Sequence, residues 1–200
     1  MSPANDKNLE ARMISAALPL FAEKGMKVTA EDIANRSGLD TSLIKDRFED
    51  PVDILHHAYR LGQKDMERLF RTPIDGTLEE YIGVLFDGMM LNIKHFGPQT
   101  YLGVVYRATE DKVLLEVVKR QSVTLNFAVK AFLMDMVSNS IIESVEGVER
   151  VNQELVATFV EHLAKLLEGM ELSDVRKAWI KQASIMFIPG AKTTPSSALG

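Results

Sequence analysis

Hydrophobic residues recur at intervals of three and four along most of the chain, which is the period of an amphipathic α-helix. The clearest stretch covers residues 148–170, where the apolar positions are Val148, Val151, Leu155, Phe159, Leu163, Leu166 and Met170. The sequence shows neither the polar–apolar alternation of a strand nor an internal repeat. The pattern therefore predicts an all-α protein of about nine helices.

Residues that favour helix ends divide the chain into segments. Thr29 with Asp32, and Thr77 with Glu80, have the spacing of capping boxes. Asp50-Pro51 also favours a helix start, because proline fits the first helical position. The predicted helices cover residues 9–24, two short stretches within 29–48, then 51–70, 77–96, 99–106, 111–139, 148–170 and, after a cap at Ser173, 174–188.

The stretch 29–48 predicts two short helices joined by a sharp turn. Gly38 stands where the chain must leave the first helix in a left-handed conformation, which glycine adopts without steric cost. Asp40 then caps a second helix, whose inward side carries Ile44 and Phe48 four residues apart. This is the layout of a helix-turn-helix, which offers its second helix to the major groove of DNA. An ordinary helical hairpin is the alternative interpretation.

Five polar side chains of this segment are candidates for contact with double-stranded DNA. Thr29 is placed to meet a backbone phosphate, and Thr41 and Ser42 to meet base edges or a phosphate. Lys45 and Arg47 are the candidates for phosphate or guanine contacts.

Charge complicates a DNA-binding interpretation. The chain has a net charge of −5, and residues 1–50 hold seven Lys/Arg against nine Asp/Glu, a local net of −2. Because phosphate neutralisation supplies most non-specific affinity, we expect weak non-specific DNA binding. A few well-placed cations can still support binding, since the local field matters more than the total charge.

The sequence gives little support to other chemistry. It has no cysteine, which excludes disulfides, thiolate metal sites and cysteine catalysis and fits a reducing cytoplasm. The adjacent His56 and His57 point about 100° apart on a helix and do not easily bind one ion. The sequence contains no zinc-protease motif, nucleophile elbow or phosphate loop. We therefore expect no enzyme activity, no metal and no cofactor.

Membrane insertion and secretion are not expected either. The longest run without Asp, Glu, Lys or Arg is residues 95–106, twelve residues that include a glycine and a proline. That run is too short for a membrane span, and the N-terminus lacks the pattern of a secretory signal. We expect a cytoplasmic protein.

The first quarter of the chain resembles the tetracycline-repressor-like (TetR) family of bacterial transcription regulators. The resemblance covers residues 9–56 and is carried by Ala17-Leu-Pro-Leu-Phe-Ala-Glu-Lys-Gly25, Asp32-Ile-Ala34, Gly38-Leu39, Phe48 and Ile54-Leu55. The chain departs from the family where DNA contact is made. Ile44-Lys45 replaces the family's common Leu-Tyr pair, Pro51 replaces a lysine, and Asp46 adds a negative charge.

The resemblance implies a helix-turn-helix DNA-binding domain in residues 1–56 and a helical ligand-binding and dimerisation domain in residues 57–188. The Pro/Gly/Ser/Thr-rich segment 189–200 is expected to be a disordered tail. The family's function implies a homodimeric repressor that binds a pseudo-palindromic operator and is released by a small apolar effector. The alternative is a TetR-shaped ligand-binding or protein-interaction module that has lost sequence-specific DNA binding.

The resemblance also points to residues for the effector pocket and the dimer interface, although such residues at helical spacing are more often plain core. The pocket candidates are Phe86, Met89, Met90, Phe96, Tyr101, Tyr106, Phe127 and Phe132. The interface candidates are Val151, Leu155, Phe159, Leu163, Leu166 and Trp179.

Overall fold

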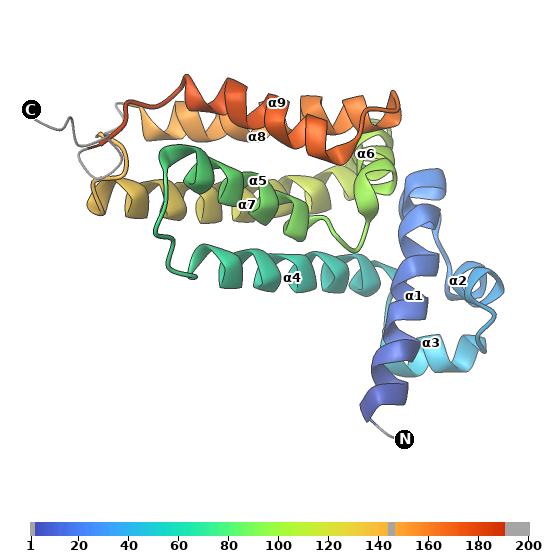
Figure 1. The fold of residues 1–200 in the computed structure, drawn as a ribbon. Coiled ribbons are helices and arrows are strands. Elements are labelled where there is room, and N and C mark those ends of the chain that lie inside the picture. The colour runs from blue at the N-terminus through green and yellow to red at the C-terminus, as the bar shows by residue number, and fades with distance from the viewer. Residues whose placement is uncertain (1–2, 144–146, 191–200) are drawn as a thin grey trace, which may run out of the picture. The chain divides into compact units, whose positions relative to one another are not determined.

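The fold is all-α, as the hydrophobic pattern predicts. The computed structural model describes residues 3–143 and 147–190. Within them lie the helices α1 Pro3–Lys24, η1 Gly25–Lys27 (a 3-10 turn), α2 Ala30–Ser37, α3 Thr41–Arg47, α4 Pro51–Phe70, α5 Leu78–Asn92, α6 Gly97–Ala108, α7 Lys112–Ser138, α8 Val148–Leu167 and α9 Leu172–Ser184 (Figure 1). The one β-type pairing in the described residues is an isolated bridge between Ile142 and Pro189.

The chain packs as two compact units. The first combines Met1–Lys64 with Asn92–Ser122, and the second combines Asp65–Leu91 with Val123–Gly200. Helices α4 and α7 therefore contribute a segment to each unit. This grouping reflects packing. The predicted boundary between a DNA-binding domain (1–56) and a ligand-binding domain (57–188) concerns function and stays a prediction.

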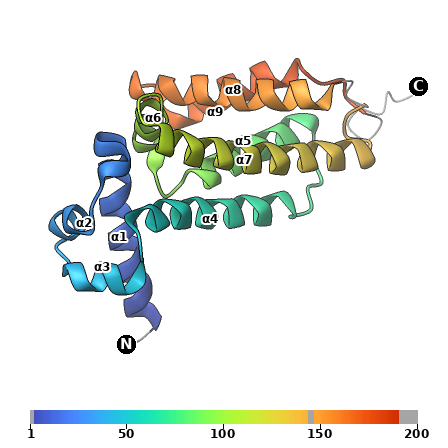
Figure 2. The same cartoon turned by 180° about the vertical axis from the view of Figure 1, so that it is seen from behind.

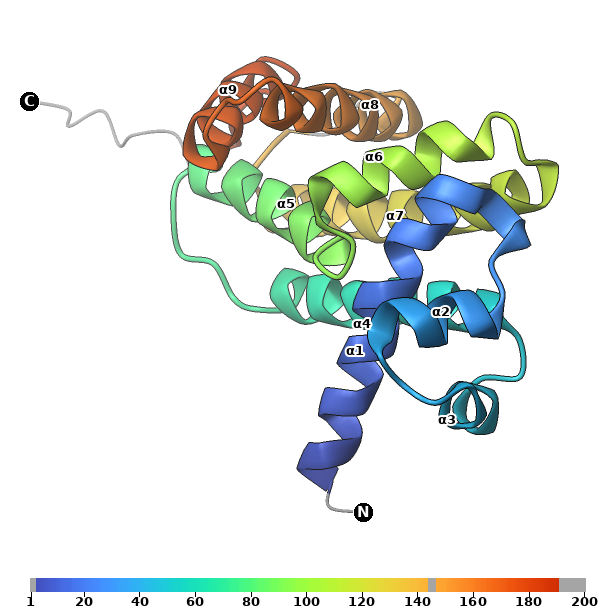
Figure 3. The ribbon, with the colours of Figure 1, turned by 90° about the vertical axis from the view of Figure 1, so that its right-hand side faces the viewer.

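Helix α1 is the centre of the first unit. Met13, Ala17 and Phe21 recur on its buried side, and α2 and α6 pack against the helix (Figure 3). A Cβ atom on Gly103 would lie 3.0 Å from the Cβ of Ala22, so glycine allows α6 a close approach to α1. The helix-turn-helix is thereby built on a helix that is buried from two sides.

A carboxylate ties the turn after α1 to the start of α7. Oδ2 of Asp111 accepts the Met26 N–H at 2.7 Å, and Oδ1 accepts the N–H groups of Val113 and Leu114 at 3.1 Å. The Met26 hydrogen bond is the main reason that the pKa of Asp111 is lowered. Gly25 has φ +61°, and a Cβ there would lie 2.4 Å from Asp111 Oδ2.

Phe86 of α5 lies at the centre of the second unit. Its ring packs at centroid distances of 5.5 Å from Phe159 of α8 and 5.6 Å from Trp179 of α9. Helices α8 and α9 run side by side (Figure 2). Arg176 of α9 also donates two hydrogen bonds of 2.8 Å to the Asp87 carboxylate of α5. Burial and a bidentate ion pair therefore fix α9 on α5.

Several helix ends differ from the sequence predictions. Helix α8 ends at Leu167 because Gly169, at φ +91°, turns the chain back and lets the Met170 N–H reach the Lys165 carbonyl at 3.0 Å. The expected cap at Ser173 is wrong, since α9 begins at Leu172 with Glu171 as N-cap.

Helix α9 ends at Ser184, before the predicted helix end at residue 188, and the structure describes two residues of the predicted tail. The Gly190 N–H donates to the Ile141 carbonyl at 2.8 Å, next to the bridge at Pro189. The remainder of the expected tail, residues 191–200, lies outside the described residues.

The contact at Gly25 gives a stability prediction with a matched control. Gly97 has φ +69° but nothing within 4 Å of its Cβ position, so Gly97→Ala is expected to cost about 1–2 kcal/mol, the strain of a left-handed residue. Gly25→Ala carries the same strain and also displaces Asp111, so we expect about 1–3 kcal/mol more. Urea unfolding measures both. Equal losses of stability at the two positions would show that Asp111 moves aside freely. In a chain that also carries Asp111→Ala, Gly25→Ala should cost only about as much as Gly97→Ala.

Candidate nucleic-acid interface

The turn between α2 and α3 has the conformation that a helix-turn-helix requires. Thr29 Oγ1 accepts the Asp32 N–H and Asp32 Oδ2 accepts the Thr29 N–H, both at 3.1 Å, which confirms the predicted capping box. Gly38 has φ +66° and donates its N–H to the Ala34 carbonyl at 2.9 Å. Arg12 of α1 donates to the Ser37 carbonyl at 2.9 Å and anchors the end of α2.

Helix α3 has the predicted inward and outward sides. Asp40 Oδ1 accepts both the N–H and the hydroxyl of Ser42 at 2.9 Å, so this hydroxyl is already used in the cap. Ile44 is 1% exposed, and Phe48 meets the ring of His57 edge-on at a centroid distance of 5.9 Å. Ser42 and Lys45 are exposed, as an outward-facing polar side requires, whereas Thr41 is partly buried.

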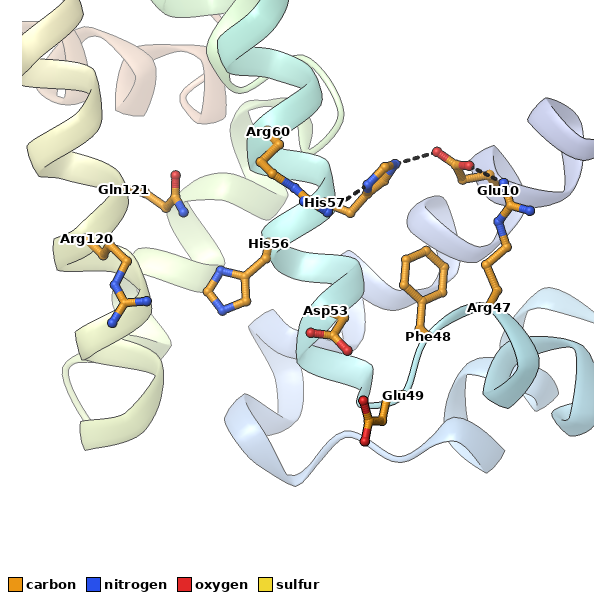
Figure 4. A pocket seen from close by; sticks show the side chains of 10 residues that line it. All are labelled: Glu10, Arg47, Phe48, Glu49, Asp53, His56, His57, Arg60, Arg120 and Gln121. Carbon is orange, nitrogen blue, oxygen red and sulfur yellow. Dashed lines mark hydrogen bonds and ion pairs between the residues drawn. The ribbon is translucent and has the colours of Figure 1, made fainter.

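Both cations of α3 form ion pairs with carboxylates of other helices. Lys45 Nζ lies 3.0 Å from Glu31 Oε1, and the two side chains are 60% and 59% exposed. Arg47 Nη2 lies 2.6 Å from Glu10 Oε2 of α1, in more sheltered surroundings (Figure 4). Residues 29–50 hold three Lys/Arg against six Asp/Glu, a net of −3. The outward side of α3 is therefore not a positive surface as it stands.

The pKa values of the two carboxylates agree with these pairings. The hydrogen bond from Lys45 is the main reason that the pKa of Glu31 is lowered. Burial raises the pKa of Glu10, but hydrogen bonds from Arg47 and His57 outweigh burial and the net pKa is lowered. Both carboxylates are therefore ionised near neutral pH and offset the charge of their partners.

A groove runs between the start of α2 and the connection from α3 to α4. Its volume is about 760 Å³, and its apolar lining includes Met26, Val28, Ile44 and Phe48. The charged residues that line it are Glu31, Lys45, Asp46, Arg47, Glu49 and Asp50. Pro51, in place of the lysine of the TetR pattern, adds no charge to this groove. Acids outnumber cations here, which opposes phosphate binding.

No protein-family model and no curated protein matches this sequence. Solved structures do match the fold. One is a candidate TetR-family transcriptional regulator from Rhodococcus sp., with TM-score 0.67 at 11% identity over 88% of this chain and 97% of that chain. Salmonella enterica GusR gives TM-score 0.66 at 15% identity over 93% and 97%. A candidate regulator from Saccharomonospora viridis in complex with choline matches with a TM-score of 0.64 at 14% sequence identity, over 91% of this chain and 98% of that chain.

Other matching structures are TetR-family regulators from further organisms. The chain has the TetR fold. At identities this low the likeness is one of fold, so the chemistry has to be argued from the residues of this chain.

The solvent exposure of two of the eight pocket candidates contradicts their predicted role. Tyr106 and Phe127 are 70% and 75% exposed, so they point outward and cannot line an enclosed pocket. Phe86, Met89, Met90 and Phe132 belong to the second unit, whereas Phe96 and Tyr101 belong to the first. Within the first unit Phe96 packs on Tyr59 at a centroid distance of 4.5 Å. A ligand role for these six residues stays a prediction.

The interface candidates need a larger correction. Five of the six, Val151, Leu155, Phe159, Leu163 and Trp179, are at most 5% exposed within a single chain. A side chain that is already buried in its own protomer has no area to lose to a partner, so these five are core residues. Only Leu166 keeps partial exposure. These seam residues of α8 point inward, so a dimer through the α8–α9 hairpin would have to use the other side of that hairpin.

Two residues that shape this candidate interface, Glu10 and Glu31, are not among the sequence-based candidates. Their partners lie 37 and 14 residues away, at spacings that carry no local signal. The part of the chain that the structure describes contains no group of at least three His, Cys, Asp or Glu able to hold a metal ion. None of its helices is long and apolar enough to cross a membrane.

Proposed function

We propose that the chain is a ligand-responsive, DNA-binding transcription regulator that acts as a repressor. The observation that carries this proposal is the helix-turn-helix itself. Thr29 and Asp40 cap its two helices, Gly38 makes the turn, and Ser42 and Lys45 are exposed on the outward side of α3. The likeness of the whole fold to TetR-family regulators supports the same function.

DNA binding by this surface requires an exchange of ionic partners. A phosphate that approaches Lys45 must replace Glu31 as its partner, and Arg47 must leave Glu10 before it can reach DNA. An ion pair between two exposed side chains contributes little to stability, so Lys45 is the easier of the two to release. Lys45 is therefore the principal phosphate contact in this proposal, with Thr29, Thr41 and Ser42 beside it.

A second candidate function is favoured by the same ion pairs. Matched cations and an acidic groove suit a TetR-shaped ligand-binding or protein-interaction module that does not bind DNA. Recovery of genomic fragments by the full chain at roughly 50 and 200 mM salt separates the two functions, because phosphate contacts weaken with salt. If no fragment is recovered at the lower salt concentration, the second function replaces the first.

Substitutions at the Lys45–Glu31 pair test the proposed contact in a recovered fragment. Lys45→Ala should weaken binding to every sequence and reduce the salt slope by about one unit. Glu31→Gln should strengthen binding, because it removes a negative charge and releases Lys45. Fluorescence anisotropy at several salt concentrations measures both effects.

The control for these substitutions is Lys119→Ala on α7. Lys119 lies 3.0 Å from Glu116 with exposures of 60% and 71%, which nearly match those of the Lys45–Glu31 pair. Lys119→Ala should leave the affinity for DNA and its salt slope unchanged. An unchanged affinity and slope in Lys45→Ala would remove Lys45 from the DNA contact.

We propose that a small apolar effector binds in the helical body and lowers DNA affinity. A ligand shifts such an equilibrium only by binding one of two states more tightly. The choline complex of the Saccharomonospora viridis neighbour supports a small-molecule ligand for this fold. A thermal-shift screen of lipophilic compounds should stabilise the chain in at least one condition. A screen in which nothing raises the melting temperature counts against an effector.

We propose a homodimer that uses the α8–α9 hairpin, since a helix-turn-helix regulator binds paired half-sites. Exposed apolar side chains on and beside the hairpin are Leu167, Met170, Leu172, Ile185 and Ile188. Sedimentation at micromolar concentration should show a dimer. Ile185→Glu should weaken it about tenfold or more, since Ile185 is 83% exposed in one chain. Val123→Glu, at an exposed position of α7, is the control, and a wild-type chain that sediments only as a monomer would contradict the proposal.

A further inference from the structure

A polar pocket lies beside the end of α3 and is separate from the outward surface of that helix. Its volume is about 600 Å³, and α1, the α3–α4 connection, α4 and α7 all line it (Figure 4). All the residues that line it belong to the first compact unit. Three arginines and three carboxylates line the pocket, so its lining is balanced in charge whereas the chain as a whole is acidic.

One wall of the pocket is a closed hydrogen-bond network. Glu10 Oε2 accepts from Arg47 at 2.6 Å, and Glu10 Oε1 is paired with Nε2 of His57. Arg60 lies 3.2 Å from Nδ1 of the same imidazole. Since an arginine can only donate, Nδ1 is the acceptor and Nε2 carries the hydrogen that goes to Glu10. Both oxygens of the Glu10 carboxylate are therefore already in use.

The opposite wall offers donors. His56 of α4 and Arg120 of α7 point toward one another across the pocket, and the Gln121 amide lies beside them (Figure 4). The nearby carboxylate of Asp53 accepts the Asp50 N–H at 3.1 Å in the cap of α4. A guanidinium, an imidazole and an amide thus face a shared space. One of the closest carboxylates, that of Asp53, is engaged in capping α4.

The electrostatics at His56 agree with this arrangement. Burial is the main reason that the pKa of His56 is lowered, and the charge of Arg120 is the next. Arg60 lowers this pKa further, while Asp53 opposes the two arginines. Two arginines and one carboxylate thus act on the pKa of this imidazole, and this local excess of positive charge favours an anion at its side.

We propose that Arg120, His56 and Gln121 form a binding site for a small oxyanion, the carboxylate or phosphate group of a metabolite. Planar guanidinium donors match such groups bidentately, and a neighbouring imidazole and amide add directional hydrogen bonds. A bound oxyanion connects α4 to α7 and lies beside Phe48 and Glu49, the residues that follow α3. The site does not depend on DNA binding, so its test is independent of the proposed function.

Histidine NMR in the full chain provides a site-specific test with inorganic phosphate as the probe. Phosphate is titrated near neutral pH with the ionic strength held constant by chloride, and the His56 signal is assigned with His56→Gln. A bound anion favours the imidazolium, so we expect a saturable shift of the His56 signal. His162, which is buried in the second unit and bonded to the Thr158 carbonyl, should not move.

Variants of the arginine identify the donor. Arg120→Gln should weaken phosphate binding about tenfold or more, since a charge-assisted hydrogen bond is lost. Arg120→Lys keeps the charge and should retain part of the affinity. Arg150→Gln, which removes another exposed arginine that lies on α8, should change nothing. A parallel titration with acetate distinguishes the two kinds of ligand. Tighter binding of phosphate indicates a phosphate ester, and tighter binding of acetate indicates a carboxylic acid.

Three results would overturn the site. They are a His56 shift that does not saturate with either anion, an equal shift at His162, and unchanged binding in Arg120→Gln. The first indicates general ionic effects, the second a global change, and the third a different donor set.

Discussion

The ion pairs of α3 are the constraint on which any function of the helix-turn-helix depends. Lys45 and Arg47 are both paired, but they are not equivalent. Glu31 and Lys45 are both well exposed, so water and salt screen their attraction and the pair opens at small cost. Glu10 is more sheltered and also pairs with His57, so releasing Arg47 disrupts two interactions. Helix α3 thus carries one readily available cation and one that is held by α1 and α4.

A second constraint links the helix-turn-helix to the start of α7. Asp111 accepts three backbone N–H groups, two in the first turn of α7 and one at Met26, just ahead of α2. The left-handed Gly25 leaves no room for a side chain at this contact. A displacement of the first turn of α7 must therefore carry the turn before α2 with it or break the bond to Met26. In the same unit, the close approach at Gly103 keeps α6 on α1. The link between the helix-turn-helix and the later helices therefore does not rest on the Asp111–Met26 hydrogen bond alone.

The features predicted correctly from sequence are those that the sequence encodes locally. Thr29 with Asp32, and Thr77 with Glu80, are separated by three residues, and both capping boxes form as the spacing predicts. Periodicity predicts that α8 has an apolar side, but it does not say whether that side meets its own chain or a partner. Phe86 reaches that space from α5, far away in sequence, and packs on Phe159 of α8 and on Trp179 of the following helix. The predicted pocket role of Tyr106 and Phe127 is wrong for the same reason, because helical spacing does not tell which of the neighbouring helices, if any, a side chain faces.

The structural neighbours show why the fold and the chemistry of this chain have to be argued separately. At 11–15% identity and TM-scores of 0.64–0.67, the path of the backbone survives while most side chains differ. Apolar periodicity and caps are sufficient to specify such a path, because many side chains fill a core of similar volume. Charge is not constrained in this way. In this chain carboxylates offset the cations on the outward side of α3, while cationic groups collect around His56 on another side of the same unit. The charge around each proposed anion contact is therefore set by side chains that the fold does not determine.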